Sequence, residues 1–284
     1  MTSSSSTVRS ADGTSIAYTR RGSGPAVILV DGALCHRGMG PNARTAELLA
    51  ERGFTTYAFD RRGRGESGDT RPYAVAREVE DVAALLDAAG GRAALFGISS
   101  GAALALEAAA VREGVTQVIC FEPPFIVDGT KPALAADFVD RLDAHVAAGR
   151  HGAAVRQFLG EVGMPAPMIR LMALTPIWRK LAAIAPTLPN DMRIVGAHQQ
   201  GGPLDRGHWA GITAPVTVID GGRSPAWMRN GNAHLADVLG ARYMTLPGQT
   251  HMVKPKVLAP ALADVLGVGG SHALVAPGRV ESAA

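Results

Sequence analysis

The sequence predicts an α/β protein: a doubly wound, mostly parallel sheet of eight strands with a helical segment inserted into it. Three observations predict this class. Short apolar runs alternate with longer segments of helical periodicity over residues 1–124, the alternation stops at about Phe125, and it returns near residue 216. The 284 residues are 47% hydrophobic, which is enough to build a large core.

The predicted strands are short and apolar. Ala26–Val30 reads AVILV, a continuous apolar run typical of a strand covered on both faces. Two strands flanking the turn at Asp12 and Gly13 form an opening hairpin. The two hairpin strands are expected at residues 7–10 and 15–20. The other strands are expected at residues 55–59, 93–98, 116–121, 216–219 and 243–246.

The predicted helices lie between these strands. In residues 75–89, Val75, Val79, Val82 and Leu86 recur at helical spacing while charged side chains occupy the other positions, so one face is buried and the other wet. Further core helices are expected at residues 41–52, 100–111, 230–239 and 256–266.

The domain organisation follows from where the alternation breaks. Residues 125–210 contain helical stretches interrupted by prolines and no convincing strand, so they are predicted to form a helical lid inserted after the sixth strand. The core is then residues 1–124 and 211–268, and residues 269–284, rich in Gly, Ser and Ala, are predicted to be a flexible tail.

Composition excludes several classes of function. The formal net charge is only +3, without a concentrated basic patch, which argues against nucleic acid as a partner. No segment reads as a secretory signal, and no apolar run approaches the roughly 20 residues of a membrane span. Cys35 and Cys120 match no metal or redox spacing, so free thiols and a cytoplasmic location are expected. No motif calls for a metal or an organic cofactor.

A G-x-S-x-G pattern carries the strongest chemical signal. It spans Gly97 to Gly101, directly after an apolar strand and directly before a helix, which is where a sharp turn would expose Ser99 as a nucleophile. The following helix points free N–H groups at the site where negative charge develops. The alternative is a strand–turn–helix in which these residues only cap the helix.

Four segments, in order, resemble the α/β-hydrolase superfamily. The turn at Gly32 resembles H-G-x, although Asp31 stands where histidine is common, and the turn from Asp60 to Ser67 resembles D-x-R-G-x-G-x-S, a structural motif. The other two are the Ser99 turn and the late L-P-G-Q-T-H loop that ends at His251. The resemblance implies an α/β-hydrolase fold, with Ser99 as nucleophile and His251 as its general base.

The position of the carboxylate that would pair with His251 differs from the commonest pattern of that family. After the seventh strand the family usually reads H-G-x-x-D, whereas here Ser224 occupies the place of the acid. Some members carry the acid at the end of the sixth strand, which makes Glu122 the candidate, with Asp220 and Asp128 as alternatives. The alternative for Glu122 is a structural carboxylate paired with a lid arginine.

The predicted reaction is acyl transfer to water from an ester, thioester or lactone, with backbone N–H groups of Ala33 and Ser100 as the oxyanion hole. A serine nucleophile argues against epoxide hydrolysis or haloalkane dehalogenation, which use aspartate in this fold. A small, apolar, ester-like substrate is expected, and its predicted binding residues are Leu34, His36, Trp178 and Met252, with an apolar lid. The alternative is a nonhydrolytic member of the fold, a cyclase, lyase or small-molecule binder.

Overall fold

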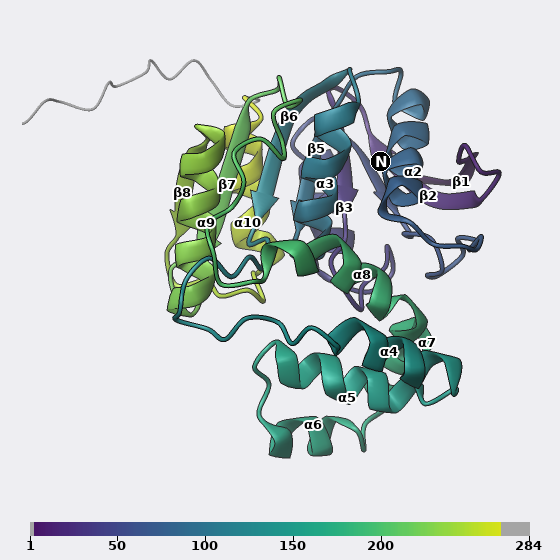
Figure 1. The fold of residues 1–284 in the computed structure, drawn as a ribbon. Helices are drawn as coiled ribbons and strands as arrows, with labels where there is room; N and C mark the ends of the chain where they lie inside the picture. Colours follow the sequence, from purple (N-terminus) through teal and green to yellow (C-terminus); the bar gives the residue numbers. More distant parts are fainter. Residues whose placement is uncertain (1–2, 268–284) are drawn as a thin grey trace, which may run out of the picture.

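One eight-stranded sheet organises the structure, a computed structural model that describes residues 3–267 (Figure 1). Its strands are β1 (Ser3–Arg9), β2 (Ser15–Gly22), β3 (Ala26–Val30), β4 (Thr55–Phe59), β5 (Ala93–Ile98), β6 (Val115–Phe121), β7 (Val216–Gly221) and β8 (Arg242–Leu246). Their order is β1-β2-β4-β3-β5-β6-β7-β8. Strand β2 runs antiparallel to both its neighbours, and the pairs from β4 to β8 are parallel. The predicted mostly parallel sheet is confirmed.

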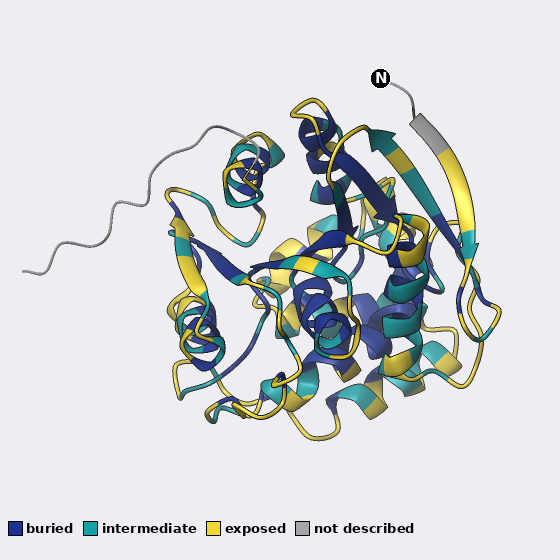
Figure 2. Cartoon of the chain, turned by 90° about the horizontal axis from the view of Figure 1, so that it is seen from above, coloured by how far each residue is buried: buried dark blue, intermediate teal, exposed yellow. Residues whose placement is uncertain are grey.

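Successive residues of the central strands enter two different apolar layers. Ile28 and Val30 of β3 join one cluster, whereas Val27 and Leu29 join the other. The first layer packs against α2 (Val75–Ala88), α3 (Ser100–Val111) and α9 (Ala226–Leu239), and the second against α1 (Pro41–Ala50) and α10 (Pro255–Val265). Figure 2 shows the central strands buried between the helical layers. Burial on both faces explains the continuous apolar runs in the sequence.

Two elements begin four residues earlier than the sequence predicts. Strand β1 begins at Ser3 rather than residue 7, because its backbone pairs with β2 along the whole hairpin whatever the side chains are. Helix α9 begins at Ala226, four residues before the predicted start. Asn232 lies inside it because its amide donates to the carbonyl of Met228 and so does not interrupt the helix.

Between β6 and β7 the chain forms a helical insertion. It contains α4 (Phe138–Ala147), α5 (His151–Glu161), α6 (Ala166–Met172), α7 (Pro176–Ile184) and α8 (Leu188–Val195), with 3₁₀ turns at Ala185–Thr187 and Gly196–His198. All lie within the predicted segment 125–210. Figure 1 shows α4 to α7 grouped below the sheet, at the end toward which β6 runs, with α8 between them and α3. The predicted tail, 269–284, lies outside the described residues.

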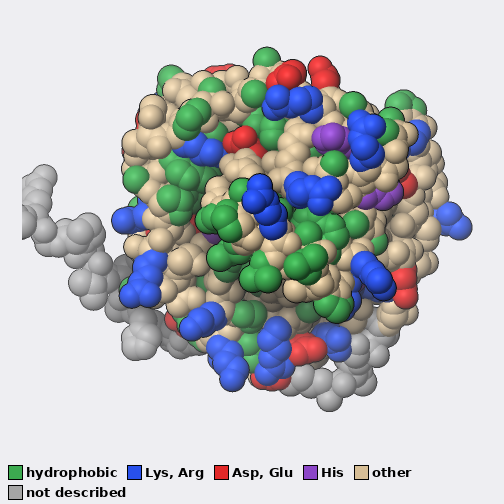
Figure 3. Space-filling model, turned by 90° about the horizontal axis from the view of Figure 1, so that it is seen from below, with side chains coloured by type: hydrophobic (Ala, Val, Ile, Leu, Met, Phe, Trp, Pro, Cys, Tyr) green, Lys and Arg blue, Asp and Glu red, His purple; other side chains and the backbone are tan. Residues whose placement is uncertain are grey.

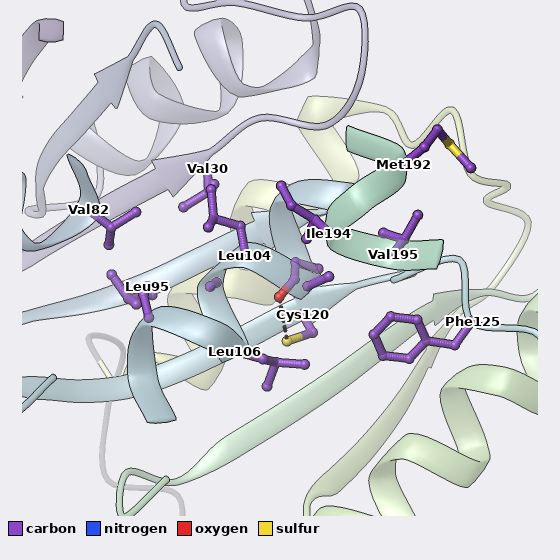
Figure 4. Packing of buried hydrophobic residues seen from close by; sticks show 14 of the residues in the cluster. Val30, Val82, Leu95, Leu104, Leu106, Cys120, Phe125, Met192, Ile194 and Val195 are labelled. Atoms are coloured by element: carbon purple, nitrogen blue, oxygen red, sulfur yellow. Dashed lines mark hydrogen bonds between the residues drawn. The ribbon is translucent and has the colours of Figure 1, made fainter. Parts of the chain in front are cut away.

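Helix α8 connects the insertion to the core. Its Ile194 and Val195 are buried in the same cluster as Val30, Leu104 and Cys120 (Figure 4). By contrast, α6, the start of α7 and the turn between them expose apolar side chains: Met168, Leu171, Leu174 and Ile177 are each at least 39% exposed. Figure 3 views the molecule from below, where hydrophobic and basic side chains are interspersed. Within residues 3–267, no helix combines the length and the apolar character needed to cross a membrane.

Candidate active site

The turn from Gly97 to Gly101, called here the elbow, holds Ser99 in a backbone conformation that few non-glycine residues adopt. Ser99 has φ 58° and ψ −128°. A Cβ atom on Gly97 would lie 2.3 Å from the carbonyl oxygen of Gly101, and one on Gly101 would lie 2.4 Å from that of Val30. Only glycine fits at either flank, so the turn can be tight enough to present Ser99 at the end of β5.

The loop of residues 31–35, called here the Gly32 turn, lies directly against Ser99. A Cβ on Gly32 would lie 2.9 Å from the Cβ of Ser99 and 3.6 Å from its Oγ. The N–H groups of Ala33 and Ser100 donate to no residue of the described chain. Two unpaired amide donors therefore flank the serine, on the two loops where the sequence predicts an oxyanion hole.

The structure pairs His251 with Glu122. Nδ1 of His251 lies 2.8 Å from Oε2 of Glu122, and the backbone N–H of Gly221 donates to Oε1 of the same carboxylate at 2.7 Å. Glu122 is fully buried and has φ 47°, whereas the side chain of His251 is 35% exposed. With Nδ1 engaged by the carboxylate, Nε2 is the nitrogen left to take a proton.

Backbone contacts place the three residues on one edge of the sheet. The N–H of Ser99 donates to the carbonyl of Phe121, the residue before Glu122, at 2.9 Å. A Cβ on Gly221 would lie 2.6 Å from the carbonyl oxygen of Gln249, two residues before His251. Ser99, Glu122 and His251 thus follow the carboxyl ends of β5, β6 and β8, although the described structure has no hydrogen bond between Ser99 and His251.

The other acid candidates lie elsewhere. Asp220 accepts hydrogen bonds from Tyr243 Oη at 2.5 Å and from Arg229 Nε at 3.2 Å. Asp128 accepts from the backbone N–H of Thr130 at 2.9 Å and from Asn230 at 2.7 Å. Within residues 3–267, neither of them bonds His251, and no arginine of the insertion pairs with Glu122.

The predicted substrate-binding residues are in diverse environments. Leu34 is buried with φ 58°, and His36 accepts a bond from the N–H of Gly38 at 3.1 Å. Met252, beside His251, is 83% exposed. Trp178 packs inside the insertion, where its indole Nε1 would lie 3.2 Å from a Cβ on Gly152 of α5. These contacts do not bring Trp178 to Ser99.

The arginine-rich turn is structural, as the resemblance implies. Arg61, Arg62 and Arg64 are at most 2% exposed, so none of them is available to a phosphate backbone. Their carboxylate partners are Glu78 and Asp191 for Arg61, Asp81 and Asp12 for Arg62, and Asp191 for Arg64. Asp191, on α8, is a residue that the sequence analysis missed; its signal was one acid within the short helix Leu188–Val195.

Asp31, where the family often has histidine, is buried and its carboxylate oxygens bond to no described residue. Burial raises its pKa to about 7, against the opposing effect of Arg64 and Arg61. The raised pKa means that the folded state favours protonated Asp31. The contribution of protonated Asp31 to the stability of the folded state is therefore full below about pH 4, and it is lost as the pH rises to about 7.

Asp31→Asn is accordingly expected to gain thermal stability over the wild type as the pH rises. The difference in Tm should grow between pH 4 and pH 7 by on the order of 5 °C and then level off. Thermal melts of both proteins across this range measure it, and the subtraction cancels the titration of every shared group. A constant difference would mean that Asp31 is already ionised at pH 4.

Candidate ligands for a metal occur away from the elbow. Glu107, His198 and His208 have donor atoms within 4.8 Å of one another. Glu107 Oε1 already bonds His208 Nε2 at 2.8 Å and accepts from Trp209 Nε1 at 2.9 Å, so the carboxylate has partners without an ion. The two cysteines are free, and burial raises the pKa of Cys35 to about 12, which disfavours the reactive thiolate.

Comparison with known proteins agrees with this fold. An alpha/beta hydrolase from Sphaerobacter thermophilus is 48% identical, with a TM-score of 0.84, and the match covers 92% of this chain and 100% of that one. The bottromycin epimerase BotH, solved with bottromycin A2, is 26% identical, with a TM-score of 0.61 over 93% of this chain and 98% of its own. An esterase from Exiguobacterium antarcticum shares the fold at 17% identity, with a TM-score of 0.68 over 93% and 99%. A search of curated proteins finds no match.

A sequence profile of a protein family also matches the chain. The profile described as the alpha/beta hydrolase family matches residues 31–261. This range begins at the Gly32 turn and includes the elbow, Glu122, the helical insertion and His251. The match spans most of the chain and contains every loop of the candidate site, so the chain belongs to the alpha/beta hydrolase family.

Proposed function

We propose that this protein is a serine hydrolase that cleaves a carboxylic ester, thioester or lactone through an acyl-enzyme. The observation that carries the proposal is the pairing of His251 Nδ1 with the buried carboxylate of Glu122, on the same edge of the sheet as the strained Ser99. A buried carboxylate behind an imidazole orients the ring and stabilises its protonated form, which is what a serine nucleophile requires.

In the proposed reaction Ser99 Oγ attacks the substrate carbonyl carbon while His251 Nε2 takes the hydroxyl proton. The negative charge that develops on the carbonyl oxygen is stabilised by the N–H groups of Ala33 and Ser100, and Glu122 offsets the charge on the imidazolium. The C–O or C–S bond to the leaving group then breaks as His251 returns the proton to it. Water, deprotonated by the same histidine, releases the acid and restores the Ser99 hydroxyl.

The proposed substrate is a small molecule with an apolar acyl or alcohol group. Leu34, His36 and Met252 flank the proposed site along the chain, while the apolar part of the insertion supplies a lid. We place neither nucleic acid nor a membrane among the partners, and we expect the protein to act in the cytoplasm, as the sequence predicts. The burial of Arg61, Arg62 and Arg64 supports the first exclusion.

A serine-directed fluorophosphonate probe tests the reaction class. Stoichiometric labelling is expected, with the added mass on the peptide that contains Ser99, and labelling should disappear in His251→Ala. Absence of labelling in the folded wild type would contradict the proposal and favour a nonhydrolytic enzyme or a binder. That second candidate is supported by the 26% identity to an epimerase and by Ser224 at the usual place of the acid.

Chain-length preference follows from the apolar lid. With p-nitrophenyl esters, kcat/KM is expected to rise about tenfold or more from acetate to a medium acyl chain, because each additional buried methylene contributes about 0.8 kcal/mol. Initial rates at substrate concentrations well below KM measure it. Equal kcat/KM for acetate and octanoate would contradict an apolar acyl pocket.

A further inference from the structure

Asp191 is a buried acid on the insertion, held between two arginines of the core. Its Oδ1 accepts from Arg61 Nη1 and its Oδ2 from Arg64 Nη2, both at 2.6 Å, and it is 1% exposed. Burial acts to raise the pKa of Asp191, but Arg64 and Arg61 outweigh it and hold the pKa below its usual value. The carboxylate is therefore ionised and fixed at both oxygens.

The same two guanidinium groups also bond the backbone of the Gly32 turn. Arg64 Nη1 donates to the carbonyl of Gly32 at 2.7 Å and to that of Cys35 at 3.1 Å, and Arg61 Nη1 donates to the carbonyl of Asp31 at 3.2 Å. Arg64 occupies a variable position of the arginine-rich motif, between Gly63 and Gly65. This role is thus not implied by the motif.

One of these bonds acts on a proposed oxyanion donor. The C=O of Gly32 and the N–H of Ala33 belong to the same planar trans peptide and point in opposite directions, so a bond that fixes one fixes the other. A cationic donor on the carbonyl also polarises the peptide and strengthens its N–H as a donor. The Ala33 N–H itself bonds to no residue within 3–267 and is available to a substrate oxygen.

The second proposed donor is linked to the same carboxylate. The hydroxyl of Ser100 donates to Asp191 Oδ1 at 2.7 Å, and the Ser100 N–H is the other unpaired amide beside Ser99. One side chain on the helical insertion is therefore connected to both loops of the oxyanion hole, through Arg64 on one side and directly on the other.

We propose, resting on the serine hydrolase function above, that Asp191 is a positioning residue that holds Arg64 on the Gly32 carbonyl and so orients the Ala33 N–H toward the substrate oxygen. The insertion then does more than cover the site. Any displacement of α8 would loosen the oxyanion hole, because Asp191 would move with the helix.

The chain contains a matched control for this idea. Arg62 and Asp81 form a second buried pair, with bonds of 2.8 and 2.7 Å, in the same arginine-rich turn. The other bonds of Arg62 go to Asp12 and to the carbonyl of Arg77, and none goes to the Gly32 turn. Asp81→Asn should thus cost stability as Asp191→Asn does, without disturbing the Ala33 peptide.

Steady-state kinetics well below the Tm of each variant give the first measurement. Asp191→Asn is expected to lower kcat about 10- to 100-fold with KM changed less than about threefold, since an oxyanion donor is misaligned rather than removed. Asp81→Asn should keep kcat within about twofold of the wild type. Equal losses in the two variants would show that Asp191 serves stability alone.

The second measurement does not depend on turnover. Labelling with ¹³C′-glycine and ¹⁵N-alanine selects Gly–Ala peptides in NMR spectra, among them Gly32–Ala33, with Gly240–Ala241 as a distant reference. The Ala33 amide proton is expected to move upfield in Asp191→Asn and to stay in place in Asp81→Asn. An unmoved Ala33 resonance in Asp191→Asn overturns the proposal. If the wild type hydrolyses no ester, the proposed function fails while this resonance still decides the positioning.

A milder variant keeps the test decisive if Asp191→Asn does not fold. Thr187 Oγ1 accepts from Arg64 Nε at 3.0 Å, so Thr187→Val loosens the same arginine without removing a charge. A smaller upfield shift of Ala33 and a kcat reduced a few-fold are expected. If both remain at wild-type values, Arg64 does not need this support and the proposal is wrong.

Discussion

Ser99→Ala is expected to lower kcat by on the order of 10⁴- to 10⁶-fold on any ester that the wild type hydrolyses. The loss is this large because the residue supplies the attacking atom, and what remains is catalysis by the oxyanion hole and by binding. His251→Ala should cost a similar factor. The double variant should be no worse than either single one, because nucleophile and base act as a unit.

The control for this prediction is another serine near the same edge of the sheet. Ser224 is buried, its hydroxyl bonds to no described residue, and it lies just after β7. Ser224→Ala should leave kcat within about twofold of the wild type. Additive losses in the Ser99 and His251 variants would contradict a shared proton transfer, and residual turnover in Ser99→Ala near the wild-type level would exclude Ser99 as the nucleophile.

Glu122→Gln is expected to lower kcat by about 10³- to 10⁴-fold at neutral pH. An amide of the same shape can still hold the ring through Nδ1, but it carries no charge to offset the imidazolium and can favour the wrong tautomer. Because the Gly221 N–H can still donate to the side-chain oxygen of glutamine, the loop should stay in place. Kinetics combined with thermal melts separate the loss of charge from a loss of folding.

Asp220→Asn serves as the matched variant for Glu122. Asp220 is fully buried at the end of β7, next to Gly221, and its bonds go to Tyr243 and Arg229. Its replacement should reduce stability and leave kcat within about threefold. If Asp220→Asn instead lost activity as strongly as Glu122→Gln, the carboxylate that serves the histidine would have to be reassigned.

The fold followed from local signals in the chain. Ala26–Val30, Ala93–Ile98 and Ser100–Val111 have the bounds that their sequences predict, because a strand covered on both faces needs a continuous apolar run and a sharp turn needs glycine. The elbow was predictable for the same reason. Its steric requirement acts within five residues of chain, where sequence order and spatial proximity coincide.

Tertiary structure alone showed which side chains meet. Glu122 and His251 are 129 residues apart, and the sequence left Asp220 and Asp128 as alternative acids, because all three follow predicted strands or their loops. The resemblance identified the arginine-rich turn as structural but did not identify its partners, and its burial depends on carboxylates from α2 and from α8 of the insertion. Trp178 packs against Gly152 of α5, and its contact with substrate stays a prediction.

By itself, the sequence determined the order of strands and helices, the family and the position of the elbow, since each depends on interactions between near neighbours in the chain. The partner of His251 and the link from Asp191 to the Gly32 turn were decided only when the strands were side by side and the insertion had folded back onto α3. Hydrogen bonds and ion pairs act over about 3 Å in space, whatever the separation in sequence, so the residues that they join could be identified only from the folded chain.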